Sequence, residues 1–279
     1  MVNYLVEEFT KAGLPEPKSD AYLLMDYLAG MNRSALFIHA NDPLDPETED
    51  KLRGAAAKRI KRIPLQHLTG FQSFMGLEIA VNEHVLIPRQ DTEVLVEEIL
   101  KEGASGLRIL DVCTGSGCIL LGLLHYMNGC EGTGLDISAD ALAVARENSR
   151  RLGIPATFIQ SDLFDGLSEA GDKQKYDIIV SNPPYIRSDV IPTLMEEVRE
   201  HEPMIALDGY EDGLYFYREI IDKCRDYMMI GGKLYFEIGY DQGTEVSELM
   251  EEAGFKYVKV TKDLSGNDRV VSGEYSLTR

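Results

Sequence analysis

The residues best suited to chemistry form the turn Asn182-Pro183-Pro184-Tyr185, which follows the apolar segment 176–181. Two successive prolines fix two φ angles and remove two backbone donors, so the turn is stiff and its carbonyls are free. The Asn182 side-chain oxygen and the Pro183 carbonyl can each accept one N–H of a planar nitrogen, on which Tyr185 can stack. The turn therefore predicts methylation of an amide or amine nitrogen, with its lone pair aimed at the methyl donor. We expect catalytic roles for Asn182, Pro183 and Tyr185, and substrate contacts from all four turn residues.

A glycine-rich turn, Cys113-Thr114-Gly115-Ser116-Gly117, lies between a predicted strand and a predicted helix. Its glycines allow the backbone to approach a ligand closely, and the N-terminus of the helix favours an anionic group. A dinucleotide fingerprint needs a third glycine where this chain has Leu120, and the Gly-Lys-Ser/Thr triplet of a phosphate-binding loop is absent. We therefore expect a nucleoside ligand without a polyphosphate.

Two carboxylates, Asp136 and Asp162, stand at the ends of the next two predicted strands. Asp136 is placed to accept hydrogen bonds from both ribose hydroxyls, and Asp162 from an adenine amino group, with Leu163 or Phe164 packed on the ring. One carboxylate at each strand end, with no lysine for a phosphate, favours S-adenosyl-L-methionine as cofactor and S-adenosyl-L-homocysteine as product. The predicted cofactor contacts are Cys113, Thr114, Gly115, Ser116, Gly117, Asp136, Asp162, Leu163 and Asn182.

Alternating strands and helices must position these residues. From about residue 88 the strands read as near-continuous apolar runs separated by helical segments, which predicts a doubly wound, Rossmann-like α/β domain. Two final strands joined by a Ser-Gly-Asn-Asp turn predict a terminal antiparallel hairpin. The predicted strands are Arg108–Val112, Gly132–Asp136, Thr157–Gln160, Asp177–Ser181, Lys233–Ile238, Lys256–Thr261 and Arg269–Leu277, and the predicted helices between them are Thr92–Lys101, Gly117–Met127, Ala139–Leu152 and Gly213–Met228.

The first part of the chain differs in character. Residues 1–70 show helical periodicity and no strand pattern, which predicts a small all-α N-terminal domain. Residues 71–87 alternate apolar and polar positions around Gly76 and predict a β-hairpin linker. The catalytic domain is then expected to span 88–279.

Charge and composition limit the partners. The formal charge of −19 opposes long-range attraction to a phosphate backbone, so we expect no direct nucleic-acid partner. The basic run Lys51–Arg62 is interpreted as a solvated helix face. No apolar run is long enough to span a membrane and the N-terminus has no signal-peptide pattern, so we expect a soluble cytoplasmic protein without a membrane partner.

The four cysteines support neither a metal site nor covalent catalysis. No two of them have a C-x-x-C spacing and no His pair accompanies them, so we expect reduced thiols and no metal. None follows a proline, as the nucleophile of a cytosine-C5 methyltransferase would. None of the five histidines lies in a motif that would make it a base.

The chain resembles the HemK/PrmC-type methyltransferases, which methylate the side-chain N5 of a glutamine in peptide-chain release factors. The resemblance covers almost the whole chain. It implies a class I methyltransferase domain with a seven-stranded mixed sheet, a small N-terminal domain for substrate recognition, a release factor as partner and a monomer. It also implies cofactor contacts at Thr114, Gly115, Gly117, Asp136, Leu163 and Asn182. The segments that carry it are Gln66–Gly70 with Phe71 and Phe74, Val85–Arg89 with Thr92 and Glu93, the glycine-rich turn, Ser181–Ile186, and 202–218 with Gly209 and Asp212-Gly213-Leu214.

Two positions depart from the family pattern. Cys113 stands where the family usually has glycine, which is tolerable if φ is negative there; its thiol either faces the cofactor or fills a small buried space. Gln90-Asp91 replaces Pro-Glu at a helix start, where Asp is still favourable. Arg89 can guide the substrate or hold a surface carboxylate.

With the resemblance included, three interpretations compete. The first is a glutamine N5-methyltransferase that acts on the Gly-Gly-Gln loop of release factors. The second is an adenine-N6 nucleic-acid methyltransferase, which shares the Asn-Pro-Pro-Tyr turn but is disfavoured by the negative charge. The third is a binding module without activity, which the intact turn and both aspartates disfavour. A glutamine methyltransferase of a ribosomal protein has the same motifs.

Overall fold

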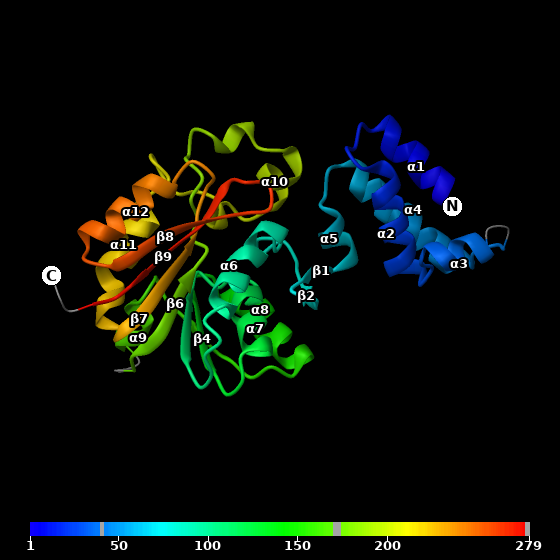
Figure 1. Cartoon of the computed structure of the whole chain (residues 1–279). Coiled ribbons are helices and arrows are strands. Elements are labelled where there is room, and N and C mark those ends of the chain that lie inside the picture. The colour runs from blue at the N-terminus through cyan, green and yellow to red at the C-terminus, as the bar shows by residue number, and fades with distance from the viewer. Residues whose placement is uncertain (40–41, 170–173, 277–279) are drawn as a thin grey trace. The chain divides into compact units, whose positions relative to one another are not determined.

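The structure is a computed structural model that describes residues 1–39, 42–169 and 174–276 (Figure 1). The chain forms two compact units. The helical unit comprises Met1–Phe71 together with Met195–His201, and the sheet unit comprises Gln72–Leu194 and the chain from Glu202 onward. The short segment 195–201 therefore belongs to the N-terminal unit although it lies far along the sequence.

The helical unit is a small bundle around one apolar core. Leu5, Phe9 and Leu24 are completely buried at its centre. Asp45 caps the longest helix by accepting a hydrogen bond from the backbone N–H of Thr48 at 2.9 Å. Its helices are α1 (Val2–Lys11), α2 (Pro17–Ala29), α3 (Arg33–Ile38), α4 (Pro46–Ile60), α5 (Leu65–Thr69) and α10 (Glu196–His201).

The basic run Lys51–Arg62 is only partly the solvated face that the sequence predicted. Lys51 and Arg53 are exposed and bind glutamates one turn earlier on α4. Arg59, in contrast, is buried, and its guanidinium donates to Asp20 at 2.8 Å and to Glu197 at 3.3 Å. The interpretation fails at Arg59 because a carboxylate from another helix of the unit is available to neutralise it.

The sheet unit contains a seven-stranded mixed sheet in the order β5-β4-β3-β6-β7-β9-β8. Strands β3 to β7 pair in parallel, and β9 pairs antiparallel with both β7 and β8. This arrangement confirms the predicted class I methyltransferase fold with its terminal antiparallel hairpin. The strands are β3 (Arg108–Val112), β4 (Glu131–Asp136), β5 (Thr157–Gln160), β6 (Tyr176–Ser181), β7 (Met228–Glu237), β8 (Lys256–Lys262) and β9 (Asp268–Glu274).

Helices cover both faces of this sheet (Figure 1). Alternate strand residues point to opposite faces, so Ile109 joins one apolar core and Leu110 the other. The first core packs against α6 (Gln90–Leu100), α7 (Cys118–Tyr126) and α8 (Ala139–Leu152), and the second against α9 (Asp165–Glu169), α11 (Tyr215–Lys223) and α12 (Gly243–Glu252). Strand order reverses between β3 and β6, and ligands of such sheets bind beyond the carboxyl ends of the strands at that point.

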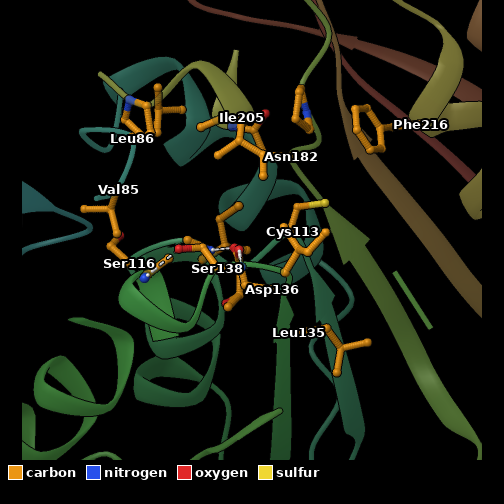
Figure 2. Close-up of a pocket in the computed structure, with 18 of the residues that line it drawn as sticks. Val85, Leu86, Cys113, Ser116, Leu135, Asp136, Ser138, Asn182, Ile205 and Phe216 are labelled. Carbon is orange, nitrogen blue, oxygen red and sulfur yellow. Dashed lines mark hydrogen bonds between the residues drawn. The ribbon is translucent and has the colours of Figure 1, made fainter. Parts of the chain in front are cut away.

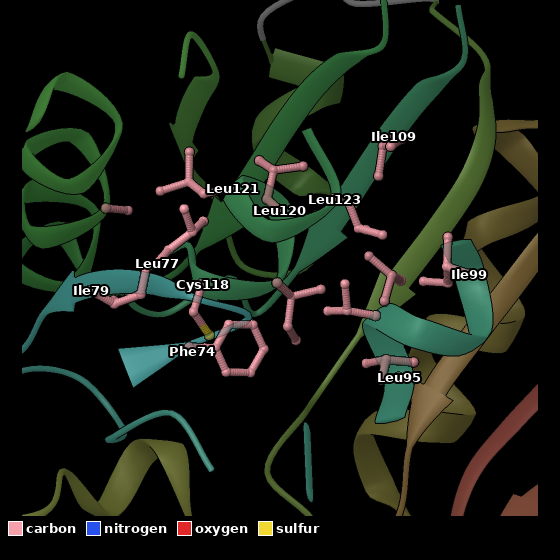
Figure 3. Packing of buried hydrophobic residues seen from close by; sticks show 14 of the residues in the cluster. Phe74, Leu77, Ile79, Leu95, Ile99, Ile109, Cys118, Leu120, Leu121 and Leu123 are labelled. Carbon is pink, nitrogen blue, oxygen red and sulfur yellow. The ribbon is translucent and has the colours of Figure 1, made fainter. Parts of the chain in front are cut away.

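The hairpin of β1 (Phe71–Phe74) and β2 (Leu77–Ala80) packs into the sheet unit. Phe74, Leu77 and Ile79 are buried in the same core as α7 (Figure 3). Buried Asn148 of α8 both accepts from the Ala80 N–H at 2.7 Å and donates to the Ala80 carbonyl at 3.0 Å. The pairing ends at Ala80, so the predicted hairpin segment 71–87 continues as a loop that leads toward the site.

The structure contains α12, which was not predicted, and differs from the predicted bounds most around the start of β7. Of the predicted helix Gly213–Met228, only Tyr215–Lys223 is α-helical; a 3-10 turn follows, and β7 begins at Met228. The register between β6 and β7 is irregular near Tyr176, and Gly231 adopts a left-handed φ of +81° just beyond it. Leu277, the predicted end of the last strand, lies outside the described residues. None of the helices in the described part of the chain is long and apolar enough to cross a membrane.

Candidate active site

A cavity opens at the carboxyl ends of β3, β4, β5 and β6, at the switch point of the sheet (Figure 2). Figure 2 shows Asn182 and Asp136 at two levels of this cavity, with Cys113 between them in the view. Among the residues that the structure describes, Gly117, Pro183 and Tyr185 do not line this cavity. The predicted site residues that do line it are Cys113, Thr114, Gly115, Ser116, Asp136, Asp162, Leu163, Asn182 and Pro184.

Asp136 is fixed at one level of the cavity by backbone donors. Its Oδ2 atom accepts from the Gly115 N–H and its Oδ1 atom from the Ser138 N–H, both at 2.9 Å. Burial raises the pKa of Asp136, and these backbone hydrogen bonds oppose that rise by favouring the carboxylate. Each oxygen keeps a lone pair, so the side chain can accept two hydroxyl donors from a ligand.

A second aspartate, the buried Asp111, forms a hydrogen bond with the glycine-rich turn. The Thr114 hydroxyl donates to Asp111 at 2.6 Å, and the Thr114 N–H donates to the Leu135 carbonyl at 2.8 Å. Burial raises the pKa of Asp111 to about 7. Sequence analysis did not assign Asp111 a role, although a charged residue inside an otherwise apolar strand was a usable signal.

Cys113 corrects one expectation. Its φ is +63°, in the left-handed region, whereas we expected a negative value at which glycine is dispensable. The residue is therefore strained, which explains why glycine suits this position. Its side chain lines the cavity and is half-buried, and burial raises the pKa of the thiol far above its usual range. A neutral thiol thus faces the cavity.

Asn182 stands at the other level of the cavity with one free acceptor. Its Nδ2 atom donates to the Thr92 hydroxyl over 3.5 Å. Its Oδ1 atom is buried and has no hydrogen-bond partner among the described residues. A buried oxygen without a partner costs free energy, so this atom is suited to receive an N–H from a ligand.

Tyr185 points away from the cavity. Its hydroxyl donates to Oε1 of buried Glu237 over 3.4 Å, and its ring packs against the second apolar core. The Tyr185 carbonyl accepts from the Gln242 amide at 3.2 Å. A role in stacking on the substrate stays a prediction, whereas the contacts in the structure anchor the turn.

Two glycines let the chain pass close behind the turn. A Cβ atom on Gly209 would lie 2.8 Å from the Tyr185 backbone, and one on Gly213 would lie 2.5 Å from the Tyr185 carbonyl oxygen. Gly213 also has a φ of +73°. The same Gln242 amide that donates to Tyr185 donates to the Gly213 carbonyl at 3.2 Å. These contacts give a physical reason for the glycines in the segment that resembles the family.

Arg89 lines the cavity and is paired. Its Nη2 atom donates to both carboxylate oxygens of Glu202, at 2.6 and 2.8 Å. Burial raises the pKa of Glu202, and the Arg89 charge opposes that rise. Arg89 was expected either to guide the substrate or to bind a surface carboxylate. The structure supports the second role, except that the carboxylate, Glu202, is buried.

Several lining residues were not anticipated. Ile137 and Ser138 follow Asp136 directly, and Ser138 caps α8, a signal that was present in the sequence. His84 is exposed and lines the cavity, although no motif marked it. An aromatic group from the segment after the reactive turn completes the wall: Tyr210, Tyr215 and Phe216, whose rings contact one another.

Comparison with known proteins assigns the chain to a family. Residues 1–70 match the family model "PrmC N-terminal domain" and residues 104–254 match "Methyltransferase domain". The chain is 39% identical over 270 residues to the release factor glutamine methyltransferase of Geobacter sulfurreducens, covering 97% of this chain and 92% of that protein. It is 40% identical over 266 residues to the protein of the same name from Caulobacter vibrioides, covering 94% and 91%.

The chain belongs to the release factor glutamine methyltransferase family. A solved methyltransferase from Pyrococcus furiosus shares the fold, with a TM-score of 0.53 and 15% identity over 84% of this chain and 100% of that one. This membership confirms the family that the motifs indicated. The cofactor of this methyltransferase is S-adenosyl-L-methionine.

The charges in the cavity fit this cofactor. The described lining carries two carboxylates, Asp136 and Asp162, and its arginine is already bound to Glu202. A cavity with this balance attracts a cation such as a sulfonium and opposes a phosphate. Backbone N–H groups at the start of α7 are suited to bind the carboxylate at the amino-acid end of this cofactor.

Proposed function

We propose that this enzyme transfers a methyl group from S-adenosyl-L-methionine to the side-chain amide N5 of a protein glutamine, in the Gly-Gly-Gln loop of peptide-chain release factors. Relatives that share about 39% identity over nearly the whole chain are named release factor glutamine methyltransferase. The observation in the structure that best supports the proposal is the Oδ1 atom of Asn182, a cavity residue; this atom has no hydrogen-bond partner in the part of the chain that the structure describes. An amide N–H is a donor of the right kind for it.

The chemistry assigned to each residue follows from the weakness of the nucleophile. An amide nitrogen attacks poorly because its lone pair is delocalised into the carbonyl. Acceptors at Asn182 Oδ1 and the Pro183 carbonyl bind its two N–H groups, orient the lone pair and stabilise the positive charge that develops on nitrogen. When bound, S-adenosyl-L-methionine would supply an electrophilic methyl group and leave as S-adenosyl-L-homocysteine. Asn182 and Pro183 would hold the nitrogen in place for the transfer, and its surplus proton would pass to water.

The cofactor contacts are proposed for the cavity residues around Asp136. Asp136 would accept the ribose hydroxyls, and Asp162 with Leu163 would receive the adenine. Gly117 caps the N-terminus of α7 and has no side chain, so any contact with the cofactor is proposed to come from its backbone. The N-terminal unit is proposed to recognise the release factor, because every residue assigned to the chemistry lies in the sheet unit. We further propose a monomer that works in the cytoplasm, where release factors act.

The test is methyl transfer from radiolabelled cofactor to a purified release factor, followed by mapping of the labelled residue. We expect label at the glutamine of the Gly-Gly-Gln loop. The matched control is the same factor with that glutamine replaced by glutamate, which should take up none. Duplex DNA at low salt provides the second arm. Label in DNA, with none in the release factor, would overturn the proposal in favour of adenine methylation.

A further inference from the structure

Two buried polar side chains, Thr92 and Glu237, lie directly behind the reactive turn. Thr92 belongs to α6 and is 2% exposed, and Glu237 ends β7 and is 1% exposed. The Thr92 hydroxyl accepts from Asn182 Nδ2, and the Glu237 carboxyl accepts from the Tyr185 hydroxyl. Side chains from two elements far apart in sequence therefore contact the first and last residues of the turn.

The orientation of the Asn182 amide determines whether the clamp works. With Nδ2 toward Thr92, the Oδ1 atom is left free to accept an N–H from the target. The opposite orientation would present Nδ2, a donor, to another donor, and the target nitrogen would be repelled. A hydroxyl can serve as donor or acceptor, so Thr92 alone does not select between the two.

Glu237 can determine which of the two orientations the Asn182 amide adopts. Burial raises the pKa of Glu237 to about 7, and the nearby Thr92 hydroxyl opposes that rise by favouring the anionic form. Above that pKa the carboxylate only accepts, so the Thr92 hydroxyl donates a hydrogen bond to it and the Thr92 oxygen is left to accept from Asn182. The second carboxylate oxygen, Oε2, is buried and has no hydrogen-bond partner within the described residues, so it can accept this hydrogen bond.

We propose that Thr92 and Glu237 are positioning residues that fix the Asn182 amide with its oxygen toward the target nitrogen. This inference rests on the proposed amide clamp and adds two residues to which no role has been assigned. The contact of Thr92 with Asn182 is 3.5 Å long and that of Glu237 with Tyr185 is 3.4 Å long.

The first experiment removes the Thr92 hydroxyl without changing the shape of the side chain. Thr92→Val should slow single-turnover methylation of the release factor about tenfold or more, as expected for loss of a preorganised contact. Cofactor affinity should change less than about twofold, because the proposed contacts at Asp136, Asp162 and Leu163 are left unchanged. Thr92→Ser restores the hydroxyl and should recover most of the rate. A valine variant within threefold of wild type, or a serine variant as slow as valine, would refute the role of Thr92.

The second experiment changes Glu237 to an isosteric amide. In Glu237→Gln the new amide can donate a hydrogen bond to Thr92, which no longer prevents the Asn182 side-chain amide from rotating by about 180°. The methylation rate should therefore fall about tenfold while the protein stays folded. The wild-type rate should rise between pH 6 and 8 as Glu237 loses its proton, and the variant should lose that rise. The charged or titratable groups that act on Glu237 are Arg269 of β9, Asp91 of α6 and Tyr185. An unchanged pH profile in the variant would contradict the proposal.

A third measurement needs no substrate and so separates this inference from the proposed function. The side-chain NH₂ resonance of Asn182, assigned by its loss in Asn182→Asp, reports directly on the bond to Thr92. In Thr92→Val its proton should exchange faster and its shift should change, whereas Thr92→Ser should leave it near the wild-type position. An identical resonance in wild type, Thr92→Val and Thr92→Ser would refute the positioning role of Thr92 even if wild type methylates the release factor. A shifted resonance with no methylation by wild type would count against the proposed function alone.

Discussion

Acidic side chains inside the sheet unit are the main electrostatic feature at the scale of single residues. Burial raises the pKa values of Asp111, Asp136, Glu202 and Glu237. Asp111 and Asp136 surround the glycine-rich turn, while Glu237 and Glu202 support the reactive turn and Arg89. A cationic ligand compensates such carboxylates, and this physical relation links the acidic site to a sulfonium cofactor.

Asp136 gives the most direct prediction for the cofactor. Asp136→Ala should weaken S-adenosyl-L-methionine binding by about 2 kcal/mol, because it removes an acceptor with charge-assisted hydrogen bonds. It also removes the partner of the Gly115 N–H, so part of the loss reflects the turn. Isothermal titration calorimetry measures the effect. Asp165→Ala, an exposed change beyond the next strand, is the control, and equal affinities in the two variants would exclude Asp136 from the site.

Cys113 gives a stability prediction with an unusual sign. At an ordinary position glycine is less stable than alanine, because it loses more conformational freedom on folding. At a φ of +63° the order should reverse, since left-handed backbone costs an alanine about 1–2 kcal/mol. We expect Cys113→Gly to unfold at a higher urea concentration than Cys113→Ala. The reverse order would mean that the backbone at this position is not strained.

At the scale of elements, the strand ends were predictable from the sequence and the contacts behind them were not. Apolar runs that end in Asp136 and Asn182 identify the carboxyl edge of the sheet, because parallel strands place their ends together. The positive φ of Cys113 and the inward direction of Tyr185 depend on backbone and partners from other elements. The same holds for α10, which the chain order assigns to the catalytic domain but whose Glu197 binds Arg59 in the helical unit.

Gly213 tests whether the segment behind the reactive turn supports it. Gly213→Ala adds a Cβ atom that would lie 2.5 Å from the Tyr185 carbonyl oxygen, so the turn must shift. Gly231→Ala is a matched control, because Gly231 also has a positive φ but has nothing within 4 Å of the added atom. Backbone strain should cost each variant about 1 kcal/mol of stability. Gly213→Ala should lose more than that, because its added atom also clashes with the Tyr185 carbonyl oxygen. Only Gly213→Ala should lose most methylation, and equal activity in the two would show that the turn does not depend on this contact.

At the scale of the whole molecule, the net charge of −19 combines exposed and buried carboxylates with opposite effects on stability. Exposed acids such as Glu147 and Asp212 form ion pairs with arginines that lower their pKa values. Their contribution is present above the pKa of the unfolded chain and is lost only as the pH falls below about 4. Asp111 and Glu237 behave in the opposite way, since burial raises their pKa values to about 7.

The folded protein therefore binds more protons than the unfolded chain between about pH 4 and 7, and its free energy of unfolding should fall as the pH rises through that range. For each of the two buried groups the loss is on the order of 2–3 kcal/mol between pH 4.5 and 8. Urea unfolding of wild type, Glu237→Gln and the exposed change Glu251→Gln at pH 5.5 and 8 measures it. Glu237→Gln should flatten the dependence and be more stable than wild type at pH 8, although it methylates more slowly, whereas Glu251→Gln should follow wild type. Equal pH dependence in all three proteins would mean that ionising Glu237 does not lower the free energy of unfolding. In that case the Glu237 carboxylate would not reduce stability in return for faster methylation.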